Sequence, residues 1–161
     1  MVGTRPDIAY AVTKLAQFSA SPSMRHWLGI IRIMRYLRSH DSVRLTLGSR
    51  TPDLQSSNHI VPTSLVDASL MDCTTSRRST GAYVFFLDGA LISWSSKRQG
   101  LVALGSTEAE FIAGTEAARE LAWLMHFLEG IGMPEKNPIL YGDNKGARNK
   151  MHIDPGLNTF M

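Results

Sequence analysis

The feature that most constrains the fold is a change in the spacing of apolar residues about a third of the way along the chain. Before about Gly48 they recur every three or four positions, the period of an amphipathic helix, whereas after Thr63 they form short runs typical of strands. Between these regions, residues 49–62 are rich in Ser, Thr, Pro and Asn and have no periodicity, as in a surface connection. The sequence therefore predicts helices in residues 1–48, a linker at 49–62 and a separate domain over 63–161.

The amino-terminal region predicts two helices that pack against each other. The first begins near Pro6, a residue tolerated in a first helical turn, and ends at the Ser- and Pro-rich break of residues 19–22. The second covers about residues 23–39, where an apolar stripe recurs at helical spacing. We expect four apolar side chains to join the two helices: Val12, Leu15, Trp27 and Met34.

The second predicted helix is rich in arginine, and most of its arginines lie off the apolar stripe. A solvated helix face is one interpretation. Contact with nucleic-acid phosphates is the other, because guanidinium groups suit phosphate oxygens. The same alternatives apply to two basic residues further along the chain. The candidate nucleic-acid-binding residues are Arg25, Arg32, Arg35, Arg38, Lys97 and Arg98.

The region from residue 63 onward predicts an α/β domain. Short apolar runs indicate strands, and an Asp88-Gly89 pair between two of them is typical of a tight hairpin turn. The order strand, strand, strand, helix, strand predicts a mixed sheet flanked by helices. The expected strands cover about residues 64–70, 81–87, 90–95 and 138–141, and the expected helix covers about residues 106–128.

Three acidic residues stand where a charge is unfavourable for folding unless it has a partner. Asp67 interrupts an apolar strand, and a turn or edge position would also explain it. Glu110 lies on the helix stripe that faces the sheet, but residues 107–110 also resemble a capping box in which Glu110 would bind its own helix start. Asp143 follows the last strand, where it could serve a ligand site or simply cap a helix.

If these carboxylates converge, they form a donor set for divalent cations. Mg²⁺ prefers oxygen ligands and keeps several waters, which a phosphate substrate can displace. Two such ions could support phosphodiester hydrolysis without a covalent nucleophile. A catalytic triad has less support, because Cys73, Ser79 and Ser106 have no histidine and acid arranged around them in the sequence.

Composition sets broad limits on the class of protein. Hydrophobic residues make up 43% of the chain and charged residues 19%, which is ordinary for a globular protein, and the net charge of +3 permits a polyanionic partner without requiring one. Cys73 is the sole cysteine, so the chain can form neither an internal disulfide nor a multi-cysteine zinc site. No run approaches the roughly 18 apolar residues of a membrane span. We therefore expect an intracellular protein, cytoplasmic or nuclear, with no membrane partner.

Several longer sequence motifs resemble one known family. Three motifs lie in the second region: RRSTGAYVFF (residues 77–86), ISWSSKRQ (92–99) and VALGSTEAEFIA (102–113). In order and spacing they closely resemble the ribonuclease H domain of copia-type retrotransposon Pol polyproteins. Two upstream motifs, VGTRPDIAYAV (2–12) and LGIIRIMRYL (28–37), resemble the end of the reverse transcriptase and the connection that precede this domain.

The resemblance implies a ribonuclease H-like fold that cleaves the RNA strand of RNA–DNA hybrids with two Mg²⁺ ions held by four carboxylates. Asp67, Glu110 and Asp143 match three of these carboxylates as both catalytic and metal-binding residues. Asp154 falls too early in the sequence to match the fourth. We therefore expect a domain truncated at its carboxyl end, with the reverse-transcriptase core missing before Met1.

Truncation leaves the enzymatic activity open. The family usually has Asp-Ala-Asp-Trp where this chain reads Asp67-Ala68-Ser69-Leu70, and loss of a metal ligand would weaken ion binding. The sequence thus predicts a ribonuclease H-like fragment whose activity is impaired in this form. The alternative is a non-catalytic remnant that still binds nucleic acid.

Overall fold

The computed structural model describes residues 3–48, 61–73, 76–133, 138–143 and 147 of the 161-residue chain. Contacts divide the chain into two compact units, Met1–Thr46 and Leu47–Met161, and each is considered by itself. The predicted linker at 49–62 lies mostly outside the described residues. None of the described helices is long and apolar enough to cross a membrane.

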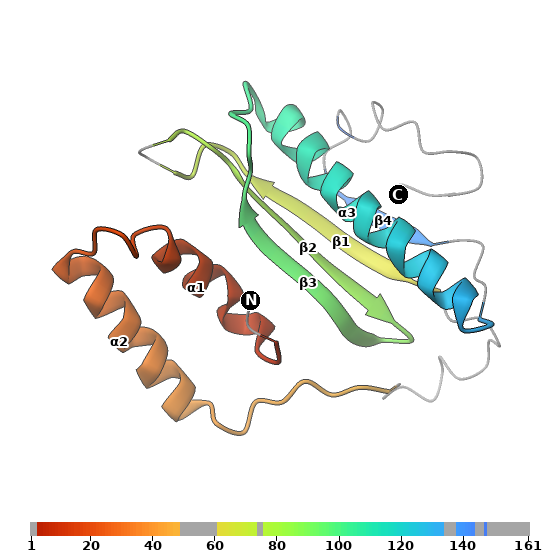
Figure 1. Cartoon of the computed structure of the whole chain (residues 1–161), viewed down its shortest axis with the longest axis horizontal. Helices are drawn as coiled ribbons and strands as arrows, with labels where there is room; N and C mark the ends of the chain where they lie inside the picture. The colour runs from red at the N-terminus through yellow and green to blue at the C-terminus, as the bar shows by residue number, and fades with distance from the viewer. Residues whose placement is uncertain (1–2, 49–60, 74–75, 134–137, 144–146, 148–161) are drawn as a thin grey trace. The chain divides into compact units, whose positions relative to one another are not determined.

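The first unit consists of a short 3-10 turn and two α-helices (Figure 1). The turn η1 covers Pro6–Ile8, α1 covers Ala9–Ala16 and α2 covers Met24–Ser39. Helix α2 begins where the sequence predicted, because Ser23 and His26 form a reciprocal capping box at its start. Helix α1 is shorter than predicted.

The contact between the two helices differs from the predicted one. The side chain of Leu15 packs over Gly29, where a Cβ atom would lie only 2.8 Å from Leu15 Cδ2. Trp27 and Met34, which were expected in this interface, are 57% and 62% exposed, so that prediction was wrong. Because Tyr36 points toward η1, Trp27, nine residues earlier, lies on about the opposite side of the helix at roughly 100° per residue.

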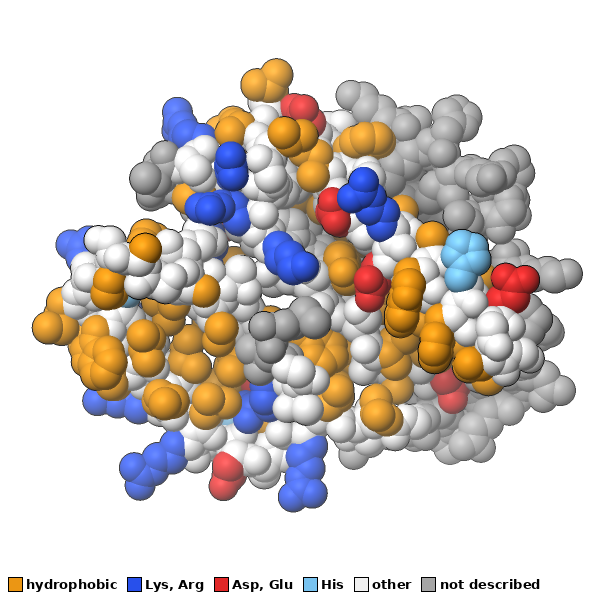
Figure 2. All heavy atoms as spheres, viewed as in Figure 1, with side chains coloured by type: hydrophobic (Ala, Val, Ile, Leu, Met, Phe, Trp, Pro, Cys, Tyr) orange, Lys and Arg blue, Asp and Glu red, His pale blue; other side chains and the backbone are white. Residues whose placement is uncertain are grey.

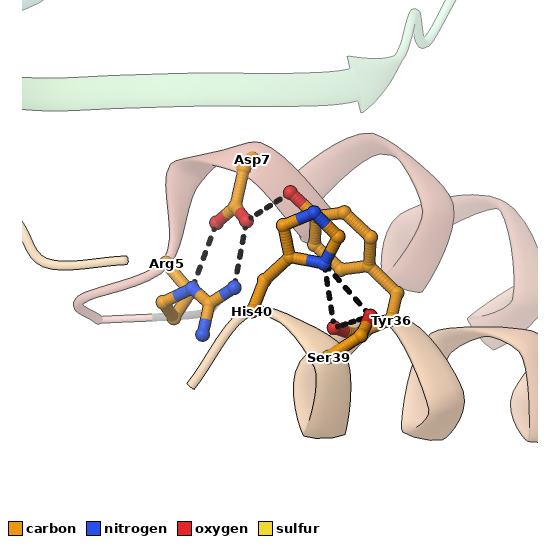
Figure 3. Close-up of polar contacts among 5 residues, drawn as sticks. All are labelled: Arg5, Asp7, Tyr36, Ser39 and His40. Carbon is orange, nitrogen blue, oxygen red and sulfur yellow. Dashed lines mark hydrogen bonds and ion pairs between the residues drawn. The ribbon is translucent and has the colours of Figure 1, made fainter. Parts of the chain in front are cut away.

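A hydrogen-bonded network fixes which face of α2 turns toward the amino-terminal segment. Arg5 donates from Nε and Nη2 to the carboxylate of Asp7 at 3.0 and 2.9 Å, and the hydroxyl of Tyr36 donates to the same carboxylate at 2.8 Å (Figure 3). At the end of α2, His40 stacks on the Tyr36 ring. The Arg5 guanidinium, followed by the Tyr36 hydroxyl, lowers the pKa of Asp7 to about 2.

Acid should therefore loosen this unit. The Asp7 carboxylate stabilises the fold above its ordinary pKa of 3.8, and this contribution is lost as the pH falls toward about 2. We expect Asp7→Asn to lower the protection of amides in α1 and α2, relative to their intrinsic exchange rates, a few-fold at pH 6, and to remove most of the wild-type loss of protection between pH 4 and 2.5. Mass spectrometry of peptides from residues 3–46 would measure the exchange. Asp41→Asn, the same change just beyond α2, is the control, and an equal response from it would contradict the assignment.

The second unit is an α/β domain whose mixed sheet confirms the predicted fold class at that level (Figure 1). Its strands are β1 (Thr63–Ser69), β2 (Thr80–Leu87), β3 (Ala90–Arg98) and β4 (Ile139–Gly142), and its helix is α3 (Ser106–Gly130). The strand order is β3-β2-β1-β4, with antiparallel pairing except between β1 and β4, which are parallel. The predicted hairpin turn is present, since Asp88 and Gly89 both have positive φ, as a type I′ turn requires.

The core of this domain lies between the sheet and α3, which packs mainly on β1. The inner face of the helix is buried at positions 113, 117, 121, 124 and 128. Gly81 on β2 allows the close approach, since a Cβ atom there would lie 3.2 Å from Ala113 Cβ. Val66, Phe85 and Leu140 complete the cluster from three adjacent strands. This packing fixes where the first turns of α3 lie against β1.

Candidate metal site

The three predicted carboxylates come together in the second unit. Asp67 is in β1, Glu110 is in the second turn of α3, and Asp143 directly follows β4. Each offers one oxygen, and these oxygens all lie within 4.8 Å of one another. Glu110 is 8% exposed, whereas Asp67 and Asp143 are open to solvent. The arrangement is a cluster of acids at the sheet surface with one buried member.

The cluster forms where β1 continues beyond its neighbour. Strand β4 pairs with β1 only as far as Val66 opposite Gly142, whereas β2 pairs with β1 up to Ser69. Among the described residues, the backbone of β1 past Val66 therefore pairs with no strand on the β4 side. There the N–H of Ala68 donates to Asp67 Oδ1 at 2.8 Å and to Glu110 Oε1 at 3.0 Å.

The structure decides between the two interpretations of Glu110. Its carboxylate accepts a hydrogen bond from β1, 42 positions earlier in the sequence, and does not bind the start of its own helix. Glu108 takes that task, because its Oε2 accepts from the Leu104 N–H at 2.7 Å. The capping-box alternative for Glu110 was therefore wrong. Glu110 is positioned by the burial of Ala113 and Ala117, which turn the same helix face toward the sheet.

It is unfavourable for all three carboxyl groups of the cluster to be negatively charged at once. Burial, together with the negative charges of Asp67 and Asp143, raises the pKa of Glu110 to about 7, against the opposing hydrogen bond from Ala68. Within the described part of the chain, no Lys or Arg forms an ion pair with any of the three acids. The cluster therefore carries excess negative charge that a cation would neutralise.

This donor set fits a hard divalent cation. All three side chains offer carboxylate oxygens, which Mg²⁺ prefers, and the two exposed members leave room for water or a phosphate oxygen. A zinc site with soft ligands is not supported here, because Cys73 is buried elsewhere, within 3.8 Å of Arg98 Nη1.

The predicted basic residues lie in two separate places. Lys97 and Arg98 are the last two residues of the edge strand β3. Lys97 pairs with Gly81 of β2, and Gly81 pairs in turn with Ala68 of β1. Lys97 thus lies two strands from the carboxylate cluster, about 10 Å at roughly 4.8 Å per strand. The four α2 arginines are exposed in the first unit. Asp154 lies outside the described residues.

One contributor was not predicted from the sequence, the backbone N–H of Ala68. No side-chain pattern signals it, because it becomes available only where β4 stops short of the end of β1. The residue types of the cluster were visible in the sequence, whereas the group that links Asp67 to Glu110 was not.

Comparison with known proteins places the chain among transposon proteins. No protein-family profile matches the sequence. The chain is 39% identical over 147 residues to the retrovirus-related Pol polyprotein from transposon TNT 1-94 of Nicotiana tabacum, covering 91% of this chain and 10% of that protein. The Pol polyprotein from transposon RE2 of Arabidopsis thaliana is 35% identical over 149 residues, again 10% of its length. This chain thus spans about a tenth of these polyproteins.

A shorter relative matches over most of its own length. The secreted RxLR effector protein 161 of Plasmopara viticola is 40% identical over 124 residues, which cover 77% of this chain and 82% of that protein. The fold and these matches define an α/β protein of retroelement origin with an acidic site at its sheet. More specifically, the chain belongs to the family of copia-type retrovirus-related Pol polyproteins and their shorter homologues. The predicted retrotransposon origin is confirmed at this level.

Proposed function

We propose that this chain is the ribonuclease H-like part of a retrotransposon Pol polyprotein and that it hydrolyses the RNA strand of RNA–DNA hybrids with Mg²⁺. The convergence of Asp67, Glu110 and Asp143 within 4.8 Å carries the proposal. The family membership supports it, because such an element must process nucleic acid. The order of three antiparallel strands, a helix and a further strand, which the apolar pattern predicted, is compatible with it.

The three carboxylates would hold the metal, and when bound there Mg²⁺ supplies Lewis-acid chemistry for phosphodiester hydrolysis. In that reaction a water oxygen bonds to phosphorus, the bond from phosphorus to one ester oxygen breaks, and the departing oxygen takes up a proton. Asp67 and Asp143 are exposed and face the solvent from which the substrate arrives. Glu110 is fixed by the Ala68 N–H, so its carboxylate keeps one orientation in the cluster.

The test is cleavage of a labelled 20-base-pair RNA–DNA hybrid by the purified full chain with Mg²⁺, with chelator as the negative control. Single-stranded RNA, duplex RNA and duplex DNA of the same sequence should remain intact. Asp143→Asn should slow cleavage of the hybrid at least tenfold, on the order of what disturbed metal coordination costs.

Asp88→Asn is the matched control for that variant. It removes the same charge from the hairpin turn between β2 and β3, where asparagine tolerates the positive φ of 49°, and cleavage should be unchanged. Cleavage that survives chelation, or equal losses from both variants, would count against the proposed site. Hybrid binding without any cleavage would instead favour the second candidate function, a non-catalytic nucleic-acid-binding module, which the exposed arginines of α2 also support.

A further inference from the structure

The two units of the chain carry opposite net charges. Met1–Thr46 contains seven Lys and Arg against two acids, a net charge of +5, while Leu47–Met161 contains ten against twelve, a net charge of −2. The overall charge of +3 is therefore the sum of a strongly basic first unit and a slightly acidic second unit. Helix α2 contributes most to the charge of the first unit, because its sequence has four arginines and no acid.

These four arginines are free of internal partners in the described part of the chain. Arg25, Arg32, Arg35 and Arg38 are all exposed, and none forms an ion pair or a hydrogen bond with a described residue. Arg5 shows the contrast, since both its bonds go to Asp7. Figure 2 shows Lys and Arg side chains projecting around a surface of hydrophobic side chains on this unit. Four uncompensated arginines on one helix do not serve the folding of the unit and are available to an anion.

The distribution of these arginines favours a nucleic acid over a membrane surface. A helix that lies in a bilayer interface needs an apolar face that is free of charge. At roughly 100° per residue, Arg38 lies between Trp27 and Ile31 around the solvent side of α2, and Arg35 lies close to Leu28. Among the exposed apolar side chains of α2, only Ile30, Met34 and Trp27 adjoin without a guanidinium between them, and they cover about 60°, less than the roughly 100° of an apolar stripe. Such a surface suits a ligand that alternates phosphates with sugars and bases.

We infer that the α2 arginine face, formed by Arg25, Arg32, Arg35 and Arg38, binds the sugar-phosphate backbone of a nucleic-acid duplex. From Arg25 to Arg38 the helix rises about 20 Å at roughly 1.5 Å per residue. That length corresponds to about six base pairs at roughly 3.4 Å each. The contact is sequence-independent, because guanidinium groups on phosphates fix position without reading bases. The choice of an RNA–DNA hybrid as ligand rests on the proposed function, but the binding itself needs neither the carboxylates nor a metal.

The experiment measures binding of the full chain to a fluorescein-labelled 20-base-pair RNA–DNA hybrid by anisotropy, in chelator and at 50 to 200 mM NaCl. The double variant Arg32→Gln/Arg35→Gln should weaken binding about tenfold at 0.1 M salt and lower the slope of log affinity against log salt by about two. The control is Lys14→Gln/Arg119→Gln, which removes the same charge from α1 and α3, and its affinity should change less than twofold. Arg25→Gln/Arg38→Gln, the other half of the face, should reproduce the loss of affinity. This pair replaces the first one if circular dichroism shows that the first variant does not fold.

Two further measurements separate the possible outcomes. With excess enzyme and Mg²⁺ at saturation, Arg32→Gln/Arg35→Gln should cleave the bound hybrid at the wild-type rate, so loss of binding here does not depend on the carboxylate site. Equal weakening by the control pair, or hybrid affinity unaffected by both arginine pairs, would overturn the inference. Arginine-dependent binding to vesicles with one-third anionic lipid, without arginine-dependent hybrid binding, would overturn it in favour of a membrane surface.

Discussion

Glu110→Gln should abolish Mg²⁺-dependent cleavage of the hybrid and at the same time make the metal-free protein more stable at neutral pH. The buried Glu110 carboxyl has a pKa raised from 4.5 to about 7. The folded state therefore holds this proton more tightly than the unfolded state, and wild-type stability falls as the pH rises from about 4.5 to 7. Glutamine keeps the shape of the neutral acid and removes that dependence.

The difference in the free energy of unfolding between Glu110→Gln and wild type should grow by roughly 3 kcal/mol between pH 4.5 and 7.5. Urea denaturation in chelator at a series of pH values would measure it, and the cleavage assay would show a loss of more than about a hundredfold. Glu108→Gln, two positions earlier, should leave cleavage intact and cost little stability, because the glutamine carbonyl oxygen can still accept from the Leu104 N–H. If the free energy of unfolding of Glu110→Gln varied with pH in the same way as that of wild type, the raised pKa of Glu110 would be refuted.

Phe85→Ala should be the most destabilising single change in the second unit. The Phe85 side chain is fully buried between β2 and α3, and removing a buried phenyl ring costs about 3–5 kcal/mol, much of the stability of a small domain. Because α3 would lose part of its packing against the sheet, Glu110 should also be held less firmly beside β1. We expect Phe85→Ala to lower the urea midpoint strongly.

The matched control for this change is Phe127→Ala on the outer face of the same helix. Phe127 is 50% exposed and stacks on Trp123, so its removal should cost under about 1.5 kcal/mol. Similar midpoints for the two variants would show that Phe85 does not occupy the core described here.

The strands and α3 were predictable from the sequence because local patterns and tertiary packing agree there. Predicted strand and helix ends in the second unit differ from the observed ones by at most three residues. The interface of α1 and α2 was not predictable, because α2 has apolar side chains around much of its circumference. The hydrogen bond from Tyr36 to Asp7 decides which side faces inward, and periodicity carries no information about it.

The candidate site was predictable to a similar extent. Strand alternation and helix periodicity brought Asp67 and Glu110 to neighbouring surfaces, and the end of β4 added Asp143. The capping-box pattern misled because Glu108 and Glu110 both lie near the helix start, and only the fold shows that Glu108 binds there. Charge repulsion and burial at Glu110 depend on distances between residues far apart in sequence, so a single sequence could not supply them.

The unequal lengths of β1 and β4 have a consequence for how such a domain can change over time. The clustered acids occupy a gap in the ladder that two more paired residues on β4 would fill. An insertion that lengthened β4 would give the Ala68 amide a backbone partner and displace Glu110 without altering any acidic residue. A descendant of this chain could thus keep all three acids in its alignment and still have lost their arrangement, so strand length is a better guide to inheritance of the site than residue identity.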